Sequence, residues 1–266
     1  MDAFRAVVLA AIQGLTEFLP VSSSGHLVLP QTLFGWEDQG LAFDVAVHVG
    51  SLLAVLWYFR AEVRGILGDW FGSLLGGGQS DNSRLGWMVI VATIPAVIAG
   101  LIFNDFIELN LRTGYVLATT TLVFGIILGV VDRYAKHSRH LADIGLRIAL
   151  IVGFAQAIAL IPGTSRSGIT ITAALMMGLS RSDSARFSFL LSMPIIAAAG
   201  SYKLLELIQS SAAVPWRYLF IGFAVSAATA YACIHVFMNW VERMGMMPFA
   251  IYRVILAAIL FAVLAN

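Results

Sequence analysis

Six long, almost uncharged stretches are the feature that most limits what this sequence can fold into. They cover residues 44–59, 87–103, 114–131, 187–205, 218–241 and 249–265. A helix needs roughly 17 to 25 largely apolar residues to cross the hydrocarbon core of a bilayer, and these stretches come close to that length. Only 12% of the 266 residues are charged, about half the fraction usual in soluble domains. We therefore predict an all-α polytopic membrane protein with six transmembrane helices.

Composition excludes several other classes of protein. Lys and Arg exceed Asp and Glu by 16 to 15, so bulk positive charge cannot attract a nucleic acid. Cys233 is the single cysteine, which excludes an intrachain disulfide. Residues 3–19 resemble a signal peptide, but Gln13, Glu17 and the polar run 20–26 stand where a cleavage site should follow, so we keep them in the mature chain. The sequence contains no Walker loop, HExxH, CxxC or GxSxG motif.

Four further apolar stretches are shorter: 3–19, 27–34, 148–161 and 169–179. As helices, the stretches 27–34 and 169–179 would reach only about 12 and 17 Å, too little for a bilayer. We predict two re-entrant helix hairpins, over residues 3–34 and 148–179. Backbone of this kind is tolerated at membrane depth only where it is buried in protein or lines a wet cavity, so the hairpins imply a polar cavity.

The two hairpins indicate an inverted repeat within a single membrane domain, residues 1–266. Its halves would cover about 1–135 and 145–266. Three full spans follow each hairpin, and an odd number makes the second hairpin enter from the opposite face. Residues 18–25 also resemble 160–168, with one extra residue in the second copy.

Basic residues predict the orientation. One face would carry eleven of them: Arg60, Arg64, Arg84, Arg133, Lys136, Arg139, Arg147, Arg181, Arg186, Arg243 and Arg253. The other face would carry four: Arg5, Arg112, Lys203 and Arg217. By the positive-inside rule the loops 60–86, 132–147 and 240–248 are cytoplasmic, and both termini face outward. Residues 72–83 read as a flexible loop, and His137 and His140 as part of a basic face toward lipid headgroups.

Polar side chains at membrane depth are costly and therefore point to function. Gln13 and Glu17 are four residues apart, which places both on one helical face. A carboxylate beside an amide oxygen suits a hard cation. The alternative is a pair that caps neighbouring backbone groups.

Arg166 lies between serines in a Gly-Thr-Ser-Arg-Ser-Gly loop, where a guanidinium suits bidentate capture of phosphate oxygens. The next helix would direct its N-terminal amides toward the same anion. A loop rich in serine precedes another helix start in the first half. We therefore predict a diphosphate cradle that includes Ser22, Ser23, Ser24, Ser165, Ser167 and Thr170. The alternative for each hydroxyl is a helix cap.

His26 follows the first serine loop and can exchange a proton near neutral pH. A lone buried histidine is more often structural, but Glu17 and three serines nearby favour catalysis. His48 has fewer companions and reads as a helix-packing or cavity residue.

These motifs resemble those of the undecaprenyl-diphosphate phosphatase family, the bacitracin-resistance type of membrane enzyme. Residues 13–26 read QGLTEFLPVSSSGH and match its Glu/Gln-xxx-Glu motif with the serine loop. Residues 162–170 read PGTSRSGIT and match its Pro-Gly-x-Ser-Arg-Ser-x-x-Thr motif. The similarity extends through 187–191 and 248–253. Many members have Glu where this chain has Gln13, which leaves one negative charge fewer at the metal.

The resemblance implies removal of the terminal phosphate from undecaprenyl diphosphate at the outer, periplasmic face of the inner (cytoplasmic) membrane. This recycles the lipid carrier for peptidoglycan synthesis and gives bacitracin resistance. It also implies a divalent cation, Mg²⁺ or Ca²⁺, and a fold of six spans with two re-entrant hairpins. The partners would be the polyprenyl diphosphate and membrane lipids, without nucleic acid, and a homodimer is left open.

The site residues then take these roles. Arg166, Ser165, Ser167 and Thr170 hold the diphosphate together with Ser22 and Ser24. Glu17 and Gln13 position the cation or activate the attacking group, and His26 exchanges a proton. Ser23 or Ser22 is the nucleophile, or binds phosphate while water attacks.

The rival reading is a lipid-phosphate transporter or flippase, because inverted repeats with hairpins at mid-membrane are transporter architecture. A transporter has no use for a general acid or base beside a phosphate clamp.

Overall fold

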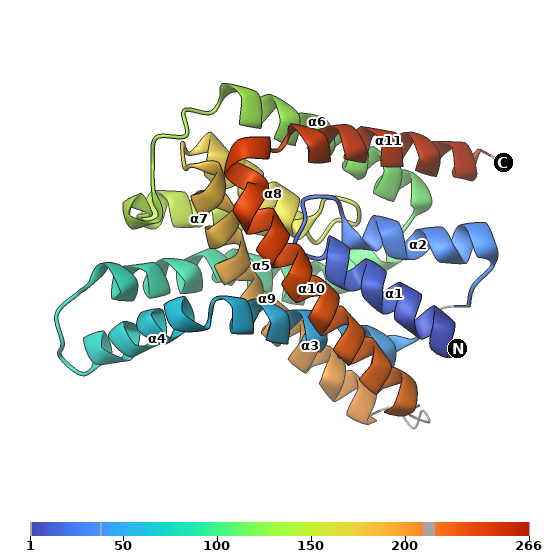
Figure 1. Ribbon diagram of the computed structural model, residues 1–266, viewed down its shortest axis with the longest axis horizontal. Helices are drawn as coiled ribbons and strands as arrows, with labels where there is room; N and C mark the ends of the chain where they lie inside the picture. Colours follow the sequence, from blue (N-terminus) through green and yellow to red (C-terminus); the bar gives the residue numbers. More distant parts are fainter. Residues whose placement is uncertain (1, 38, 210–215, 266) are drawn as a thin grey trace.

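The computed structural model describes residues 2–37, 39–209 and 216–265, and this part of the chain is all helical (Figure 1). Its helices are α1 (Ala3–Thr16), α2 (Ser23–Phe34), α3 (Leu41–Tyr58), α4 (Arg60–Leu74), α5 (Asp81–Asn110), α6 (Gly114–Tyr134), α7 (Leu146–Ile158), α8 (Arg166–Met176), α9 (Arg181–Gln209), α10 (Trp216–Met244) and α11 (Met247–Leu264). A short 3₁₀ turn covers Leu141–Asp143. The predicted all-α class is confirmed.

Six of these helices are long and apolar enough to cross a membrane: α3, α5, α6, α9, α10 and α11. They coincide with the six apolar stretches of the sequence, so the predicted number of spans is confirmed. Both ends of the chain lie on the same side of the molecule (Figure 1). This is the arrangement expected for an even number of crossings.

Four of the five remaining α-helices of the described residues form two pairs, α1–α2 and α7–α8, and a short loop joins the helices of each pair. Residues 17–22 connect α1 to α2, and residues 159–165 connect α7 to α8. The four helices have 14, 12, 13 and 11 residues, so none reaches across a bilayer. The two loops meet near the centre of the molecule, where the Ser167 hydroxyl donates to the Leu19 carbonyl (Figure 1).

The first helix of each short pair packs against a long helix of the other half of the chain: α1 packs on α10, and α7 packs on α5. Glycine permits both close approaches. A Cβ at Gly14 would lie 2.6 Å from the Ser226 carbonyl oxygen, and a Cβ at Gly153 would lie 2.7 Å from that of Ala92. These contacts fix the two short pairs relative to the long helices.

The predicted cytoplasmic loop 60–86 is wrong in detail, because most of it is helical. Ile66 and Trp70 of α4 pack against Gly86 of α5, and the Trp70 and Trp87 rings meet edge to face at 5.5 Å. Only residues 75–80 join α4 to α5, so the predicted flexible loop 72–83 is shorter than expected. The loop 240–248 likewise shrinks to a turn between Met244 and Met247.

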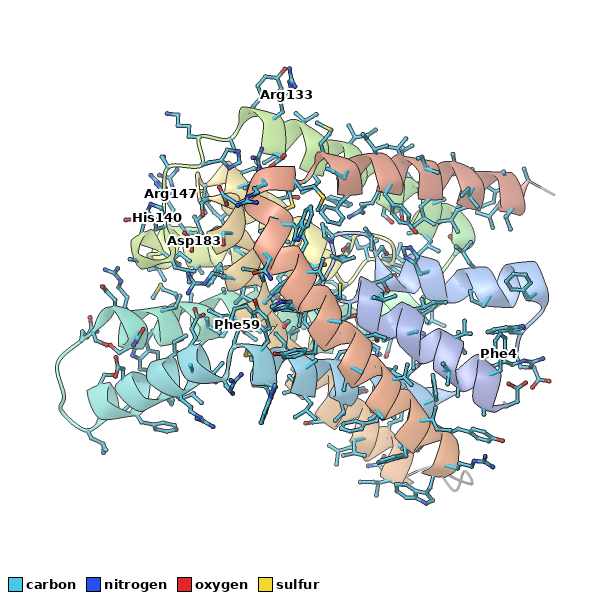
Figure 2. The ribbon with its side chains drawn as sticks, viewed as in Figure 1. Phe4, Phe59, Arg133, His140, Arg147 and Asp183 are labelled. Carbon is cyan, nitrogen blue, oxygen red and sulfur yellow. The ribbon has the colours of Figure 1, made fainter. Side chains whose placement is uncertain are left out.

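Arg253 corrects the assignment of basic residues to the two faces. It lies inside α11 and is fully buried, so it does not belong to a basic loop. Without Arg253, ten basic residues remain on the predicted cytoplasmic face against four on the other, so the positive-inside bias keeps its direction. His140 and Arg147 lie on the side of the molecule opposite Phe4 (Figure 2). The His140 ring contacts Asp183 at 3.1 Å, and His137 contacts the Asp132 carbonyl at 3.0 Å.

We predict that Gly153→Ala destabilises the protein by about 1 to 3 kcal/mol, the usual cost of forcing a methyl group into a packed contact. The measurement is thermal unfolding in mild detergent, followed by tryptophan fluorescence. Gly68→Ala in α4 is the matched control, since a Cβ there meets nothing within 4 Å. Equal effects of the two substitutions would refute the close α7–α5 packing.

Candidate active site

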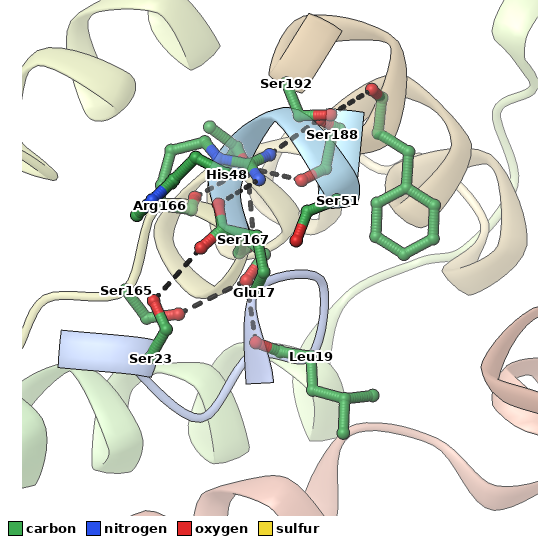
Figure 3. A network of polar contacts seen from close by, with 12 residues as sticks. Glu17, Leu19, Ser23, His48, Ser51, Ser165, Arg166, Ser167, Ser188 and Ser192 are labelled. Carbon is green, nitrogen blue, oxygen red and sulfur yellow. Dashed lines mark hydrogen bonds and ion pairs between the residues drawn. The ribbon is translucent and has the colours of Figure 1, made fainter. Parts of the chain in front are cut away.

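The carboxylate of Glu17 is the centre of a polar network between the two loops (Figure 3). One oxygen accepts a hydrogen bond from Arg166 Nη2 at 3.2 Å. The other accepts from Gln13 Nε2 at 2.9 Å and from Ser23 Oγ at 3.1 Å. Glu17 and Arg166 are 149 residues apart in the chain, and both side chains are largely buried. The ion pair therefore joins the two predicted motifs directly.

The two loops share an unusual backbone geometry. Ser22 precedes α2 with φ 73°, and Ser165 precedes α8 with φ 69°. Residues with side chains rarely occupy this left-handed region, and strain of this kind concentrates at functional sites. In each loop the serine hydroxyl caps the helix by accepting from the amide three residues later, that of Gly25 or Gly168. The faint sequence match between the loops is thus a real structural equivalence.

This equivalence places Ser23 and Arg166 at corresponding positions. Each is the first residue of its helix, α2 or α8. The first amides of a helix have no partner within the helix and carry the positive end of its dipole, so both helix starts favour an anion. A serine hydroxyl and a guanidinium therefore stand at the first positions of two matched helix starts.

Three contacts hold the Arg166 guanidinium in place. Besides Glu17, it donates to the Ser188 carbonyl of α9 at 3.1 Å and lies 5.9 Å from the centre of the Phe18 ring. A guanidinium has five N–H donors in a planar fork. The hydrogen bonds to Glu17 and Ser188 leave further N–H donors of the guanidinium for other acceptors.

Gln13 is held by a residue that the sequence assigned only to packing or a cavity, His48 of α3. His48 Nδ1 lies 2.7 Å from the Asp44 carbonyl, and Nε2 lies 3.1 Å from Gln13 Nε2. A carbonyl can only accept, so Nδ1 carries the proton and Nε2 accepts from the Gln13 amide. His48 therefore belongs to the site. The signal that could have found it is a polar side chain inside an apolar span.

His26 lies elsewhere than expected. Its Nδ1 is 2.7 Å from the Ser22 carbonyl, and its Nε2 is 2.5 Å from the hydroxyl of Tyr252 on α11. By the same reasoning Nδ1 carries the proton and Nε2 accepts from Tyr252. Among the contacts of the described residues, none joins His26 to Glu17 or Ser23. Tyr252 is a partner that the sequence did not reveal.

The other predicted hydroxyl groups divide by environment. Ser22 and Ser165 cap their helices, as the alternative interpretation held, while Ser24 is exposed and lies 3.2 Å from Ser22. Ser167 Oγ lies 3.3 Å from Ser165 Oγ.

Thr170 is fully buried and contacts the Ser188 hydroxyl at 2.7 Å. It also donates to the Arg166 carbonyl at 2.8 Å. In this structure Thr170 supports the loop against α9 instead of facing an opening.

The donor set around Glu17 fits a hard cation. Gln13 is fully buried, and its Oε1 has no hydrogen-bond partner. Nε2 of the same amide donates to Glu17, so the orphaned oxygen is at the other end of the amide group. Amide and carboxylate oxygens are both ligands of hard cations, and Mg²⁺ is commonly held by one or two carboxylates together with substrate phosphates and water. Among the described residues, no group of three or more His, Cys, Asp and Glu side chains gathers to form a protein-only site.

Comparison with known families decides the relationship. Residues 6–259 match the family model described as "Bacitracin resistance protein BacA". The chain belongs to this family. The match includes every site residue discussed above, and it confirms the resemblance that the two motifs carry.

Curated relatives align over nearly the whole chain. A protein of Teredinibacter turnerae is 58% identical over 261 residues, covering 98% of this chain and 99% of its own length. One of Saccharophagus degradans is 56% identical, covering 98% of both chains. One of Hahella chejuensis is 55% identical, covering 97% of both. Each of the three is named undecaprenyl-diphosphatase.

We predict that Arg166→Met destabilises the protein by about 3 to 5 kcal/mol, because Glu17 then stays buried without its partner. Adding Glu17→Gln should recover much of that loss, with a coupling energy above about 1 kcal/mol in thermal unfolding. Glu108→Gln and Arg112→Met form the matched control cycle. That ion pair is 3.1 Å long but more than half exposed, so its coupling should be near zero. Additive effects at Glu17 and Arg166 would contradict a direct interaction.

Proposed function

We propose that this protein removes the terminal phosphate of undecaprenyl diphosphate, yielding undecaprenyl phosphate and inorganic phosphate. The reaction recycles the lipid carrier for peptidoglycan synthesis, and it confers bacitracin resistance by consuming the diphosphate form. The observation that carries the proposal is the Glu17–Ser23–Arg166 cluster at two matched helix starts. The names of the curated relatives support the same substrate.

In the proposed reaction Arg166 and the first amides of α8 bind oxygens of the diphosphate. Ser23 Oγ attacks the terminal phosphorus while its proton passes to Glu17, which already accepts its hydrogen bond. The bond from that phosphorus to the bridging oxygen breaks, and undecaprenyl phosphate leaves. Water then hydrolyses the phosphoserine and releases phosphate. Phosphoryl transfer of this kind needs positioning and charge neutralisation more than elaborate covalent chemistry.

The cation belongs to the same proposal. Glu17 and the orphaned Gln13 Oε1 would hold Mg²⁺ or Ca²⁺, and the ion when bound neutralises negative charge on the phosphate groups. His48 fixes the Gln13 amide so that its N–H faces Glu17. His26 accepts and returns a proton at Nε2, the ring nitrogen that faces the Tyr252 hydroxyl, so it serves proton transfer between the site and its surroundings.

The proposed topology is an inverted repeat with two re-entrant hairpins, α1–α2 and α7–α8. The exchanged packing of α1 on α10 and α7 on α5 supports it, as do the matched serine loops. His140 and Arg147 lie on the side opposite Phe4 (Figure 2). By the positive-inside bias that side would be cytoplasmic and both termini would face outward. We further propose that the site takes its substrate from the periplasmic face of the inner membrane. The same architecture suits a lipid-phosphate transporter, which the experiment below separates from the phosphatase.

We predict that the purified wild type releases phosphate from undecaprenyl diphosphate and that EDTA stops the release. Glu17→Ala and Arg166→Ala should each lower kcat/KM by at least about 10²-fold, since each removes a group that stabilises transferred charge or activates the nucleophile. Ser73→Ala on α4 is the control and should keep wild-type activity.

Full activity in both site variants would refute the site. Folded wild type that binds the lipid without hydrolysing it would refute the phosphatase and favour transport.

We also predict that a phosphoserine forms at Ser23 during turnover. Substrate labelled in its terminal phosphate should leave label on the protein after acid quenching, and mass spectrometry should place it at Ser23. Ser23→Ala should carry no label, whereas the Ser73→Ala control should carry the wild-type amount. If no label appears even in variants that hydrolyse the phosphoserine slowly, the prediction is contradicted, and direct attack by water on the substrate is favoured.

A further inference from the structure

Arg253 is a buried cation that the proposed reaction does not use. It lies in α11 with no exposed surface. Its Nε donates to the Thr121 carbonyl at 3.2 Å. Its Nη2 donates to the carbonyls of Gly163 and Thr164 at 2.9 and 3.0 Å, with a longer contact of 3.4 Å to Thr120. Every described partner of the guanidinium is thus a main-chain oxygen.

Within the described part of the chain, no carboxylate forms an ion pair with Arg253. Carbonyl dipoles compensate a guanidinium only partly, and a charged side chain at membrane depth is costly. A well-packed apolar residue would avoid that cost. The buried charge therefore points to a use in the site beside it.

The hydrogen bonds of Arg253 fall on the strained part of the second loop. Gly163 has φ 87° and Ser165 has φ 69°, both in the left-handed region. Nη2 binds the carbonyls of Gly163 and Thr164, which link these two residues, and Nε binds α6. The planar fork thereby fixes the loop that ends at Arg166 against a long helix.

The remaining nitrogen, Nη1, is buried without a hydrogen-bond partner. It lies against the first turn of α8, since a Cβ at Gly168 would come within 2.7 Å of it. The Gly168 amide in turn donates to Ser165 Oγ. The positive charge of Arg253 is thus added to the positive end of the α8 dipole.

We propose that Arg253 is a positioning residue of the phosphate site, which fixes residues 163–165 and places a second positive charge behind the anion-binding end of α8. The adjacent Tyr252 contacts His26 of α2, whose Nδ1 donates to the Ser22 carbonyl of the first loop. Neighbouring positions of α11 therefore support the second loop directly and the first loop through His26. This inference rests on the proposed phosphatase function.

Two substitutions separate the geometric part of the role from the charge. Arg253→Lys keeps the charge but loses the planar fork. Its kcat should fall by up to about 10²-fold, the loss that a small misplacement of reacting groups causes. Its inhibition constant for inorganic phosphate should stay near the wild-type value. Arg253→Met loses both the charge and the fork, so kcat should fall and the inhibition constant for phosphate should rise. Arg217→Met, an exposed arginine at the start of α10, is the control for lost charge.

Thermal unfolding of each variant accompanies the kinetics. If both variants fold and keep the kcat and the phosphate inhibition of the wild type, the proposal for Arg253 is overturned. Hydrolysis by the wild-type protein in the same assay would still uphold the phosphatase function. The proposal for Arg253 is also overturned by a loss of thermal stability in both variants with an unchanged kcat in the folded fraction, which is what a merely structural arginine predicts.

Gly168→Ala tests the same contact without removing the arginine, should the Arg253 variants fail to fold. Its Cβ would displace Nη1 and disturb Ser165 Oγ, 3.1 Å from the same Cβ, so kcat should fall. Because lysine has no Nη1, the double variant with Arg253→Lys should be no slower than the slower single variant. Unchanged kcat in Gly168→Ala would contradict the contact.

Discussion

The ion pair between Glu17 and Arg166 is the interaction on which the rest of the site depends. Each charge alone would be costly at membrane depth, so each residue is tolerated there because the other accompanies it. The pair joins loops that are 149 residues apart and lie in different halves of the chain. Gln13 and Ser23 reach the same carboxylate, so their orientation follows from it. A change in how the two hairpins meet would therefore disturb all four groups together.

The two loops have the same backbone and different chemistry. Ser22 and Ser165 adopt the same left-handed conformation and cap their helices in the same way. The next position holds Ser23 in one loop and Arg166 in the other. One loop thus leads to the proposed nucleophile, and the other leads to the positive charge proposed to bind the phosphate. Neither half contains both groups, so the proposed reaction needs the two halves packed together as they are here.

Sequence patterns predicted what depends on local properties. Length and hydropathy were enough for the six spans, and the cost of polar groups in lipid singled out Glu17 and Arg166. Helix α4 was missed because residues 60–86 were interpreted as a loop that connects two apolar spans, whereas the Trp70–Trp87 contact that stabilises the helix is tertiary.

Long-range partners were also missed. His26 meets Tyr252 from 226 residues away, and no local pattern carries that information. Arg253 was assigned to a basic face by counting crossings, yet its carbonyl partners lie on α6 and the second loop.

The central claim is that one phosphate site is built from both halves, around Glu17, Ser23 and Arg166. An experimental structure with a non-hydrolysable methylene analogue of a prenyl diphosphate tests it most directly. The account predicts the terminal phosphonate within hydrogen-bond distance of the Arg166 guanidinium and in line with Ser23 Oγ. An analogue bound only at the basic surface around Arg139 and Arg147, with the Glu17–Arg166 region unchanged and empty, would contradict it.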